Sequence, residues 1–195
     1  SLADAIKGQP AFMVYKVDSR EEDRKAPAPF TTSTLQQAAS VKLGMDVDHT
    51  MKKAQALFEA GLITYHRTDS PNLAEESAQE IRAWLTGQGH AVPETRNTWA
   101  SKADAQEAHE AIRPTAIGIP PSDFAPDSDE MKLYKLIWLR AVASQMVPAR
   151  YHATKVLLLS AVKVKDHNLQ FLAKGRVLLS SGWMALTPDD AADDK

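Results

Sequence analysis

The spacing of apolar residues changes twice along this chain, and this change constrains the fold more than any other feature. Residues alternate in character or are β-branched in Ala11 to Val17 and in Tyr151 to Leu186, which favours strands. In the middle, apolar residues recur every three or four positions, which favours amphipathic helices. We therefore expect an α+β chain in which a mainly helical lobe is inserted between segments of one small sheet.

Charge changes near the same positions. The chain has 195 residues and a formal net charge of −2, but residues 150–187 are basic and residues 188–195 are acidic. Asp18 to Pro29 is charged and lacks an apolar period, which predicts a loop or linker. We expect four parts, a first β segment, a helical domain, a returning β segment and an acidic tail, over residues 1–29, 30–149, 150–187 and 188–195.

Composition excludes several classes of protein. There is no cysteine, which excludes disulfide frameworks, thiolate catalysis and cysteine zinc sites. No apolar run approaches the roughly 18 residues that cross a bilayer, and the first residues lack a leader pattern. We expect a soluble chain from a reducing compartment with no membrane partner. The net charge of −2 also argues against nucleic acid, because nonspecific binding depends on Lys and Arg.

The helical part begins with two helices and a short strand. Ser33 and Gln36 have the spacing of a capping box, and Gly44 is expected to end this helix. Asp46 or Asp48 can cap the N-terminus of the next helix, which ends near Gly61. The same two aspartates also have the spacing of a metal-binding pair, but they lie where this helix needs an N-cap, which favours capping. With a strand at Leu62 to His66, the pattern resembles a helix-turn-helix with a wing.

Three further helices are expected. Ser70 and Pro71 fit an N-cap and a first helical position, and that helix continues to Gly87. A short helix is expected over Ala103 to Ile112, and Ser128 begins the longest one. Residues 131–146 are apolar nearly all round, which predicts a central position for this last helix.

The most informative stretch is Gly61 to Ser70. In an extended backbone Ile63, Tyr65, Arg67 and Asp69 share one face. A phenol has an ordinary pKa near 10, so a cation such as Arg67 would help to ionise it, and a guanidinium also suits phosphate oxygens. Asp69 could orient the arginine or cap the next helix. A cross-strand tyrosine beside a surface Arg–Asp pair is the structural alternative.

A second stretch is Gln106 to Pro114. On a helix, His109 and Arg113 share a face that could hold an anion, with Glu110 orienting the imidazole. The alternative is a structural histidine. The zinc protease motif is excluded, because it needs a second histidine four residues after the first and position 113 is arginine.

A third stretch places four hydroxyl residues in succession, Thr31 to Thr34, at a helix start. Their donors and the positive end of the helix dipole suit a phosphate backbone. Capping by one or two of the hydroxyls, with solvated neighbours, is the alternative.

These three stretches, in this order, resemble the central part of bacterial type IA DNA topoisomerases. The resemblance implies that Tyr65 is the nucleophile and that Arg67 assists at the scissile phosphate. His66 departs from the methionine usual in related enzymes, and it is expected to face away from Tyr65 with little consequence. The implied DNA-binding residues are His109, Arg113, Thr32, Ser33, Thr34 and Gln37, with Asp69 and Glu110 as structural support and no metal ligand.

The resemblance also implies an activity and partners. Such an isomerase cleaves and religates single-stranded DNA through a 5′-phosphotyrosyl intermediate and relaxes negatively supercoiled DNA at the nucleoid in the cytoplasm. Its Mg²⁺ is bound by a TOPRIM domain, which this sequence lacks. We therefore expect no cofactor in this chain, no relaxation by it alone, and dependence on the remaining domains of the same polypeptide. Joints of a moving lobe are expected near Arg24 to Pro29 and Pro148 to Tyr151.

Two nonenzymatic interpretations remain. In a winged-helix DNA-binding module Tyr65 would only pack, and the second helix should be basic, yet it offers just Lys52 and Lys53. The other alternative is an interaction domain whose catalytic site has decayed.

Overall fold

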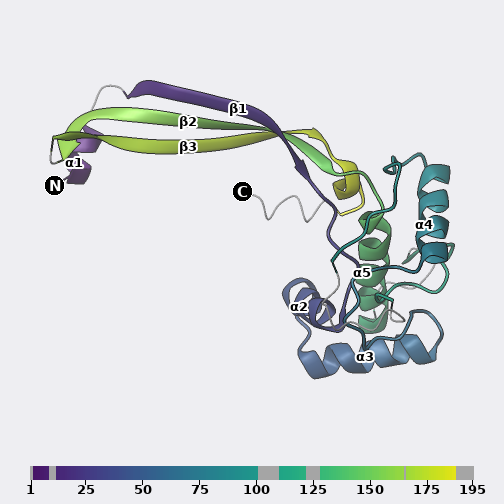
Figure 1. The fold of residues 1–195 in the computed structure, drawn as a ribbon. Helices are drawn as coiled ribbons and strands as arrows, with labels where there is room; N and C mark the ends of the chain where they lie inside the picture. Colours follow the sequence, from purple (N-terminus) through teal and green to yellow (C-terminus); the bar gives the residue numbers. More distant parts are fainter. Residues whose placement is uncertain (1, 9–11, 101–109, 122–127, 165, 188–195) are drawn as a thin grey trace. The chain divides into compact units, whose positions relative to one another are not determined.

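The chain divides into two compact units (Figure 1). The computed structural model describes residues 2–8, 12–100, 110–121, 128–164 and 166–187. The first unit, here the sheet unit, comprises Ser1–Arg24 and Ala149–Ser181, and the second, the helical unit, comprises Lys25–Pro148 and Gly182–Lys195. The architecture is α+β, with helices in one unit and a sheet in the other.

The sheet unit contains three antiparallel strands and a short helix. β1 (Met13–Arg24), β2 (Ala149–Val164) and β3 (His167–Ser180) lie in that order, so β2 pairs with both neighbours. α1 (Leu2–Lys7) precedes them. The returning segment therefore forms two long strands, in agreement with its strand-like pattern.

The prediction of a loop over Asp18 to Pro29 is wrong for its first half, because β1 continues to Arg24, and it is confirmed for residues 25–29. Ser19 lies opposite Thr154 in the sheet, and their hydroxyl oxygens are 3.0 Å apart. Arg150 of β2 makes ion pairs with Glu21 and with Asp23. No apolar period is visible in this run because neither face of the strand is buried: the four consecutive residues 18–21 are all exposed.

The helical unit is organised around its longest helix. α5 (Asp129–Ser144) packs against α2 (Thr32–Leu43), α3 (Val47–Glu59), α4 (Glu75–Gly87) and the 3-10 helix Gly182–Ala185. Half of the 16 residues of α5 are buried, including Leu133, Ile137 and Trp138. The prediction that this helix is central is confirmed. Within the described residues, no helix has the length and apolar character needed to span a bilayer.

Several predicted helix ends are confirmed. The Asp46 carboxylate accepts a hydrogen bond from the His49 backbone N–H, and the Ser128 hydroxyl accepts one from that of Met131. Gly44 ends α2 in the left-handed conformation at φ 67°, which glycine adopts without steric cost. These caps depend on neighbouring residues, which is why the sequence predicts them well.

Two predicted helix starts are wrong. Thr31, not Ser33, is the N-cap of α2, and it forms the capping box with Thr34. α4 begins at Glu75 rather than at Pro71. The Ser70 hydroxyl instead accepts from the Asn72 backbone N–H at 3.3 Å, which holds this segment in a turn.

Asn72 explains why the chain stays extended before α4. Its side-chain amide donates to the Trp99 carbonyl at 2.8 Å, and its amide oxygen accepts from the Trp99 backbone N–H at 2.8 Å. Its carbonyl accepts from the Ala111 N–H at 2.7 Å. These bonds to distant residues replace the first turn of the predicted helix.

Residues 182–187 belong to the helical unit, although their sequence had placed them with the returning β segment. The Trp183 backbone N–H donates to the Val147 carbonyl at 3.0 Å, and the Trp183 and Met184 side chains are buried. Gly182 has φ 48°, and a Cβ built on it would lie 2.3 Å from the Pro148 carbonyl oxygen. Only glycine fits this close approach of two backbones.

Candidate active site

The three motif stretches meet in the helical unit through short backbone contacts. Phe30 forms an isolated antiparallel bridge with Ile112, whose N–H donates to the Phe30 carbonyl at 2.8 Å. Ile63 forms a second bridge with Pro114. Phe30, Ile63 and Ile112 are each at most 1% exposed. The buried residues therefore bring the start of α2, the Tyr65 segment and the segment around Arg113 together.

Thr64 fixes the position of the residue next to it, Tyr65. Its backbone N–H donates to the Arg113 carbonyl at 2.9 Å. Its hydroxyl donates to the Ala111 carbonyl at 2.9 Å and accepts from the Arg113 N–H at 3.0 Å. Sequence reasoning missed this threonine, although its place inside the motif was the available signal.

The predicted strand over Leu62 to His66 is wrong, since only the bridge at Ile63 is present. Pro114 faces it, and a proline has no N–H to extend a ladder of hydrogen bonds. The predicted alternation nevertheless holds beyond Thr64: the exposed residues are Tyr65, Arg67 and Asp69, and the buried ones are His66, Thr68 and Ser70. Ile63 departs from the prediction, because it is buried.

Tyr65 is exposed to solvent, and its ring packs against two neighbouring aromatic rings. It is 52% exposed. Its ring centroid lies 5.3 Å from that of Phe58 and 5.2 Å from that of His66, both in edge-to-face geometry. Such pairs restrict the orientation of a ring while leaving its far end free. The phenol oxygen is thus accessible to a substrate.

Arg67 and Asp69 are exposed, like Tyr65. In the described part of the chain, the structure gives neither of them a hydrogen bond or an ion pair, so the Arg–Asp pair considered from the sequence is not formed. An arginine in this state keeps all its donors for an incoming anion.

His66 is buried where Tyr65 is exposed, as the alternation predicts, but its ring still contacts the tyrosine ring, with the centroids 5.2 Å apart. His66 is 1% exposed, and among the described residues neither of its ring nitrogens has a hydrogen-bond partner. Burial lowers the pKa of this histidine below its ordinary value, the Arg67 charge lowers it further, and Glu59 acts in the opposite direction. The imidazole is therefore neutral near pH 7.

Arg113 is held in place by Glu110. Its Nε and Nη2 donate to the two carboxylate oxygens of Glu110, both at 2.9 Å, and its Nη1 donates to the Pro114 carbonyl at 2.8 Å. Glu110 also accepts from the Ala74 N–H at 3.3 Å. The arginine side chain is 16% exposed. A bidentate arginine–carboxylate pair of this kind fixes the plane of the guanidinium.

Glu110 is expected from the sequence to orient the imidazole of His109, but His109 lies outside the described residues. The predicted helix over Ala103 to Ile112 is wrong at its described end, because residues 110–112 are not helical. The backbone there is engaged by Phe30 and Asn72 instead.

The hydroxyls at the start of α2 divide into two groups. Thr32 Oγ1 donates to the His66 carbonyl at 2.9 Å and accepts from the Thr68 N–H at 2.9 Å, and Thr34 is occupied in the capping box. Ser33 and Gln37 are exposed. Of the predicted DNA contacts at the start of α2, Thr32 and Thr34 thus have structural partners, and the Ser33 hydroxyl oxygen lies 3.2 Å from that of Thr31. Gln37 is exposed to solvent.

Among the described residues, no group of three or more His, Asp or Glu side chains is arranged to hold a metal ion.

Comparison with known proteins places these motifs in one family. A family model described as DNA topoisomerase matches residues 1–195. DNA topoisomerase 1 of Vibrio cholerae is 44% identical over 185 residues, which are 93% of this chain and 20% of that protein. The plasmid DNA topoisomerase I of Xylella fastidiosa is 42% identical over 194 residues, 100% of this chain and 29% of that protein.

A solved structure agrees with the sequence comparisons. Full-length topoisomerase I from Thermotoga maritima matches with a TM-score of 0.78 and 32% identity, over 95% of this chain and 31% of that one. The chain therefore spans less than a third of the length of these relatives. It belongs to the family of bacterial type IA DNA topoisomerases and corresponds to a part of the full-length proteins.

Proposed function

We propose that this chain supplies the nucleophile with which a type IA DNA topoisomerase cleaves and religates single-stranded DNA. The phenolic oxygen of Tyr65 attacks a phosphodiester, a bond forms between that oxygen and phosphorus, and the bond to the 3′ oxygen breaks. The phenol loses its proton and the leaving 3′ oxygen gains one. Religation reverses these steps, and repeated cycles relax negatively supercoiled DNA.

The observation that carries this proposal is the exposed Tyr65 on a fixed segment, with an exposed arginine two residues away that pairs with none of the described residues. Thr64 and Thr32 fix the backbone on both sides of the tyrosine. Arg67 stabilises the charge that develops on the phosphate oxygens in the transition state.

Arg113 has a different role from Arg67 in this proposal. Because Glu110 holds it in a fork, its charge is positioned in advance and it binds a neighbouring phosphate group rather than the reacting one. His109, Ser33 and Gln37 contact the same strand, and Thr32 and Thr34 act by fixing the α2 start.

Other parts of the enzyme complete this activity. In this proposal Mg²⁺ is held by the TOPRIM domain that the resemblance implies, and no step here passes through it. Single-stranded and negatively supercoiled DNA at the bacterial nucleoid are the substrates. The chain alone is inactive, and Mg²⁺-dependent relaxation of a supercoiled plasmid by the purified chain would overturn that statement.

Covalent attachment of DNA tests the role of Tyr65. The chain is joined to the remaining domains of a relative such as DNA topoisomerase 1 of Escherichia coli, which is 44% identical over 181 residues. An oligonucleotide labelled at its 3′ end should become covalently bound to this protein, whereas a 5′ label should be released on a fragment with a free 3′ hydroxyl. The matched variant Tyr65→Phe should bind neither label.

Equal attachment by both proteins would exclude Tyr65 as the nucleophile. Transfer of the 5′ label instead of the 3′ label would contradict a 5′-phosphotyrosyl link. DNA binding without attachment by either protein would favour the nonenzymatic winged-helix module.

A further inference from the structure

Three aromatic rings contact one another at the candidate active site, and Tyr65 carries one of them. Its ring centroid lies 5.3 Å from that of Phe58 and 5.2 Å from that of His66, and the Phe58 and His66 centroids are 5.8 Å apart. The exposed fractions are 52% for Tyr65, 38% for Phe58 and 1% for His66. Two rings therefore restrict the orientation of the tyrosine ring, one of them buried and one partly exposed.

The two contacts come from different parts of the chain. His66 follows Tyr65 directly, and its carbonyl accepts a hydrogen bond from the Thr32 hydroxyl at 2.9 Å. Phe58 lies seven residues before Tyr65, near the end of α3. The contact with Phe58 thus relates the tyrosine ring to a helix rather than to the segment that carries the tyrosine.

α3 holds Phe58 in a defined place because it is fixed to α5. Its residue Leu57 is 2% exposed. Along its first two turns, His49 Nε2 lies 2.8 Å from Asp129 Oδ2, and Lys53 Nζ donates to Glu130 Oε1 at 2.7 Å. The two acidic partners are the first two residues of α5. A buried face and two polar contacts therefore limit the rotation of α3 about its axis.

The turn that follows α3 is also fixed. The Leu62 N–H donates to the Leu57 carbonyl at 2.9 Å. The Thr115 N–H donates to the Leu62 carbonyl at 3.0 Å, and the Thr115 hydroxyl donates to the Gly61 carbonyl at 2.6 Å. These bonds hold the backbone between the two rings in one conformation.

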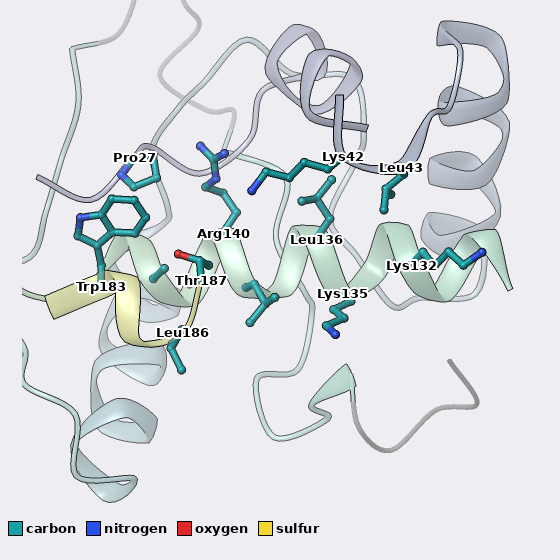
Figure 2. A pocket seen from close by; sticks show the side chains of 12 residues that line it. Pro27, Lys42, Leu43, Lys132, Lys135, Leu136, Arg140, Trp183, Leu186 and Thr187 are labelled. Atoms are coloured by element: carbon teal, nitrogen blue, oxygen red, sulfur yellow. The ribbon is translucent and has the colours of Figure 1, made fainter. Parts of the chain in front are cut away.

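The three rings are separate from the pocket beside α5 that Figure 2 shows. This pocket has a volume of about 410 Å³, and other residues line it, among them Leu43, Leu136 and Trp183. A substitution at Phe58 therefore changes the ring contacts of Tyr65 without changing the wall of this cavity.

The orientation of a half-exposed nucleophile affects its rate of attack. The side chain of an exposed tyrosine exchanges among staggered rotamers, and attack requires the phenol oxygen and the leaving 3′ oxygen to lie roughly in line with the phosphorus atom. Misplacement by about 1 Å can slow a reaction about 100-fold. Edge-to-face contacts favour some ring orientations over others, so a fixed neighbouring ring raises the fraction of productive orientations.

We propose that Phe58 is a positioning residue of the cleavage reaction, because its ring holds the Tyr65 ring in the orientation from which the phenol oxygen attacks. This inference rests on the proposed function, in which Tyr65 is the nucleophile. Phe58 exchanges no proton and forms no bond in the reaction. It acts through the tyrosine ring, and it makes the orientation of that ring depend on α3.

Nuclear magnetic resonance of the purified chain tests the ring contact without any cleavage. With isotope-labelled tyrosine, the ring signals of Tyr65 are those that disappear in Tyr65→Phe. Phe58→Leu removes an aromatic ring but keeps an apolar side chain, so these signals should move toward the values of an unfolded tyrosine. The matched control is Phe12→Leu, because Phe12 is 40% exposed and makes an edge-to-face contact with Phe171 at 5.4 Å. This control should leave the Tyr65 signals unchanged.

The rate of covalent attachment tests the positioning role in the joined enzyme, in which the chain is linked to the remaining domains of its relative. At saturating oligonucleotide, Phe58→Leu should slow attachment about 2- to 12-fold, the range that corresponds to the loss of one aromatic pair. The oligonucleotide concentration that gives half of the maximal rate should stay the same. Phe58→Tyr keeps the ring and should retain most of the rate, and Phe12→Leu should retain all of it.

Several results would overturn the proposal. These are Tyr65 signals that do not move in Phe58→Leu, an unchanged maximal rate, an equal loss of rate in Phe12→Leu, or no rescue by Phe58→Tyr. A change confined to the half-maximal concentration would make Phe58 a substrate contact instead. Attachment that persists in Tyr65→Phe would refute the proposed function and the role of Phe58 in it, while the resonance measurement would still report the ring contact.

Discussion

Thr32 ties the start of α2 to the segment that carries Tyr65 through one hydroxyl group. That oxygen donates to the His66 carbonyl and accepts from the Thr68 N–H, so both backbone groups flanking Arg67 depend on it. Thr32 is a positioning residue in the proposed reaction, since it acts on the nucleophile through the backbone.

Replacing this hydroxyl should impair positioning more than folding. Thr32→Val leaves two part-buried backbone groups without partners and should cost about 1–3 kcal/mol of unfolding free energy, and it should also slow covalent attachment of DNA in the joined enzyme. Thr32→Ser keeps the oxygen and should retain most activity. Denaturant titration and the attachment rate are measured together, and equal rates for the two variants would contradict the positioning role.

His66 should make the stability of the chain depend on pH. Its pKa in the folded state is lowered, chiefly by burial, whereas in the unfolded chain it is near 6.5. As pH falls below about 6.5, the unfolded chain binds a proton that the folded chain does not accept, so stability is lost as pH falls toward and through the lowered value. Above that range His66 contributes no pH dependence.

The variant His66→Met removes this titrating group while keeping an apolar side chain. Urea unfolding midpoints at pH 7.5 and 5.5 should fall more for the natural chain than for the variant. The other histidines are common to both proteins, so the difference isolates His66. An identical pH dependence of the two proteins would rule out this account.

At the scale of elements, the close approach at Gly182 anchors the 3-10 helix to the end of the α5 segment. A Cβ there meets the Pro148 carbonyl at 2.3 Å, whereas a Cβ on Gly44 meets nothing within 4 Å. Both glycines have positive φ, so an alanine at either position pays the cost of a left-handed conformation. Only the alanine at position 182 would also clash with the Pro148 carbonyl.

Gly182→Ala should therefore destabilise the chain more than Gly44→Ala. The left-handed conformation costs about 1–2 kcal/mol in each variant, and overpacking at Gly182 adds about 1–3 kcal/mol. Thermal unfolding of the two variants gives the comparison. A Gly44→Ala effect as large as that of Gly182→Ala would show that the clash is relieved by local movement.

The elements also show what the sequence could predict. The caps at Asp46 and Ser128 and the end at Gly44 depend on residues a few positions away, and they were predicted correctly. The start of α4 and the Ile63 bridge depend on Trp99, Ala111 and Pro114, whose approach no local pattern reveals. The charged half of β1 was missed for a related reason, since it is held by pairing with β2 rather than by a buried face.

The candidate site was predictable to a different extent. Motif order identified Tyr65, Arg67 and Arg113 and the exposed side of their segment. The fork between Glu110 and Arg113 and the contacts of Thr64 arise from segments brought together by folding, so the sequence alone did not predict them.

For the whole molecule, the helical unit should fold without the sheet unit. Buried side chains such as Leu35, Leu57, Ile81 and Leu133 lie on four of its own helices. The hydrogen bond between the Trp183 N–H and the Val147 carbonyl holds together the two points at which the chain passes between the units. A chain that begins at Lys25 and joins Pro148 to Gly182 through a short linker should therefore keep a cooperative transition.

Circular dichroism during heating measures the thermal unfolding transition of this shortened chain. The midpoint should lie within about 5 °C of that of the natural chain. For a unit of this size, such a shift corresponds to a change of roughly 1–2 kcal/mol in the free energy of unfolding. Leu133→Ala in the same shortened chain removes a side chain buried at 0% exposure and should cost about 2–5 kcal/mol. A broad transition that this variant does not alter would mean that the helical unit has no packed core of its own.

The charges of Asp18–Arg24 have a consequence for solubility. β1 is an outer strand of its sheet, and the backbone groups along its outer side are a template on which a second chain can add a strand. Closely spaced charges on such a strand oppose aggregation, because a copy laid against them must bring like charges together or strip them of water. The residues that look least like a strand in the sequence are thus those that keep a two-sided, solvent-exposed sheet from polymerising.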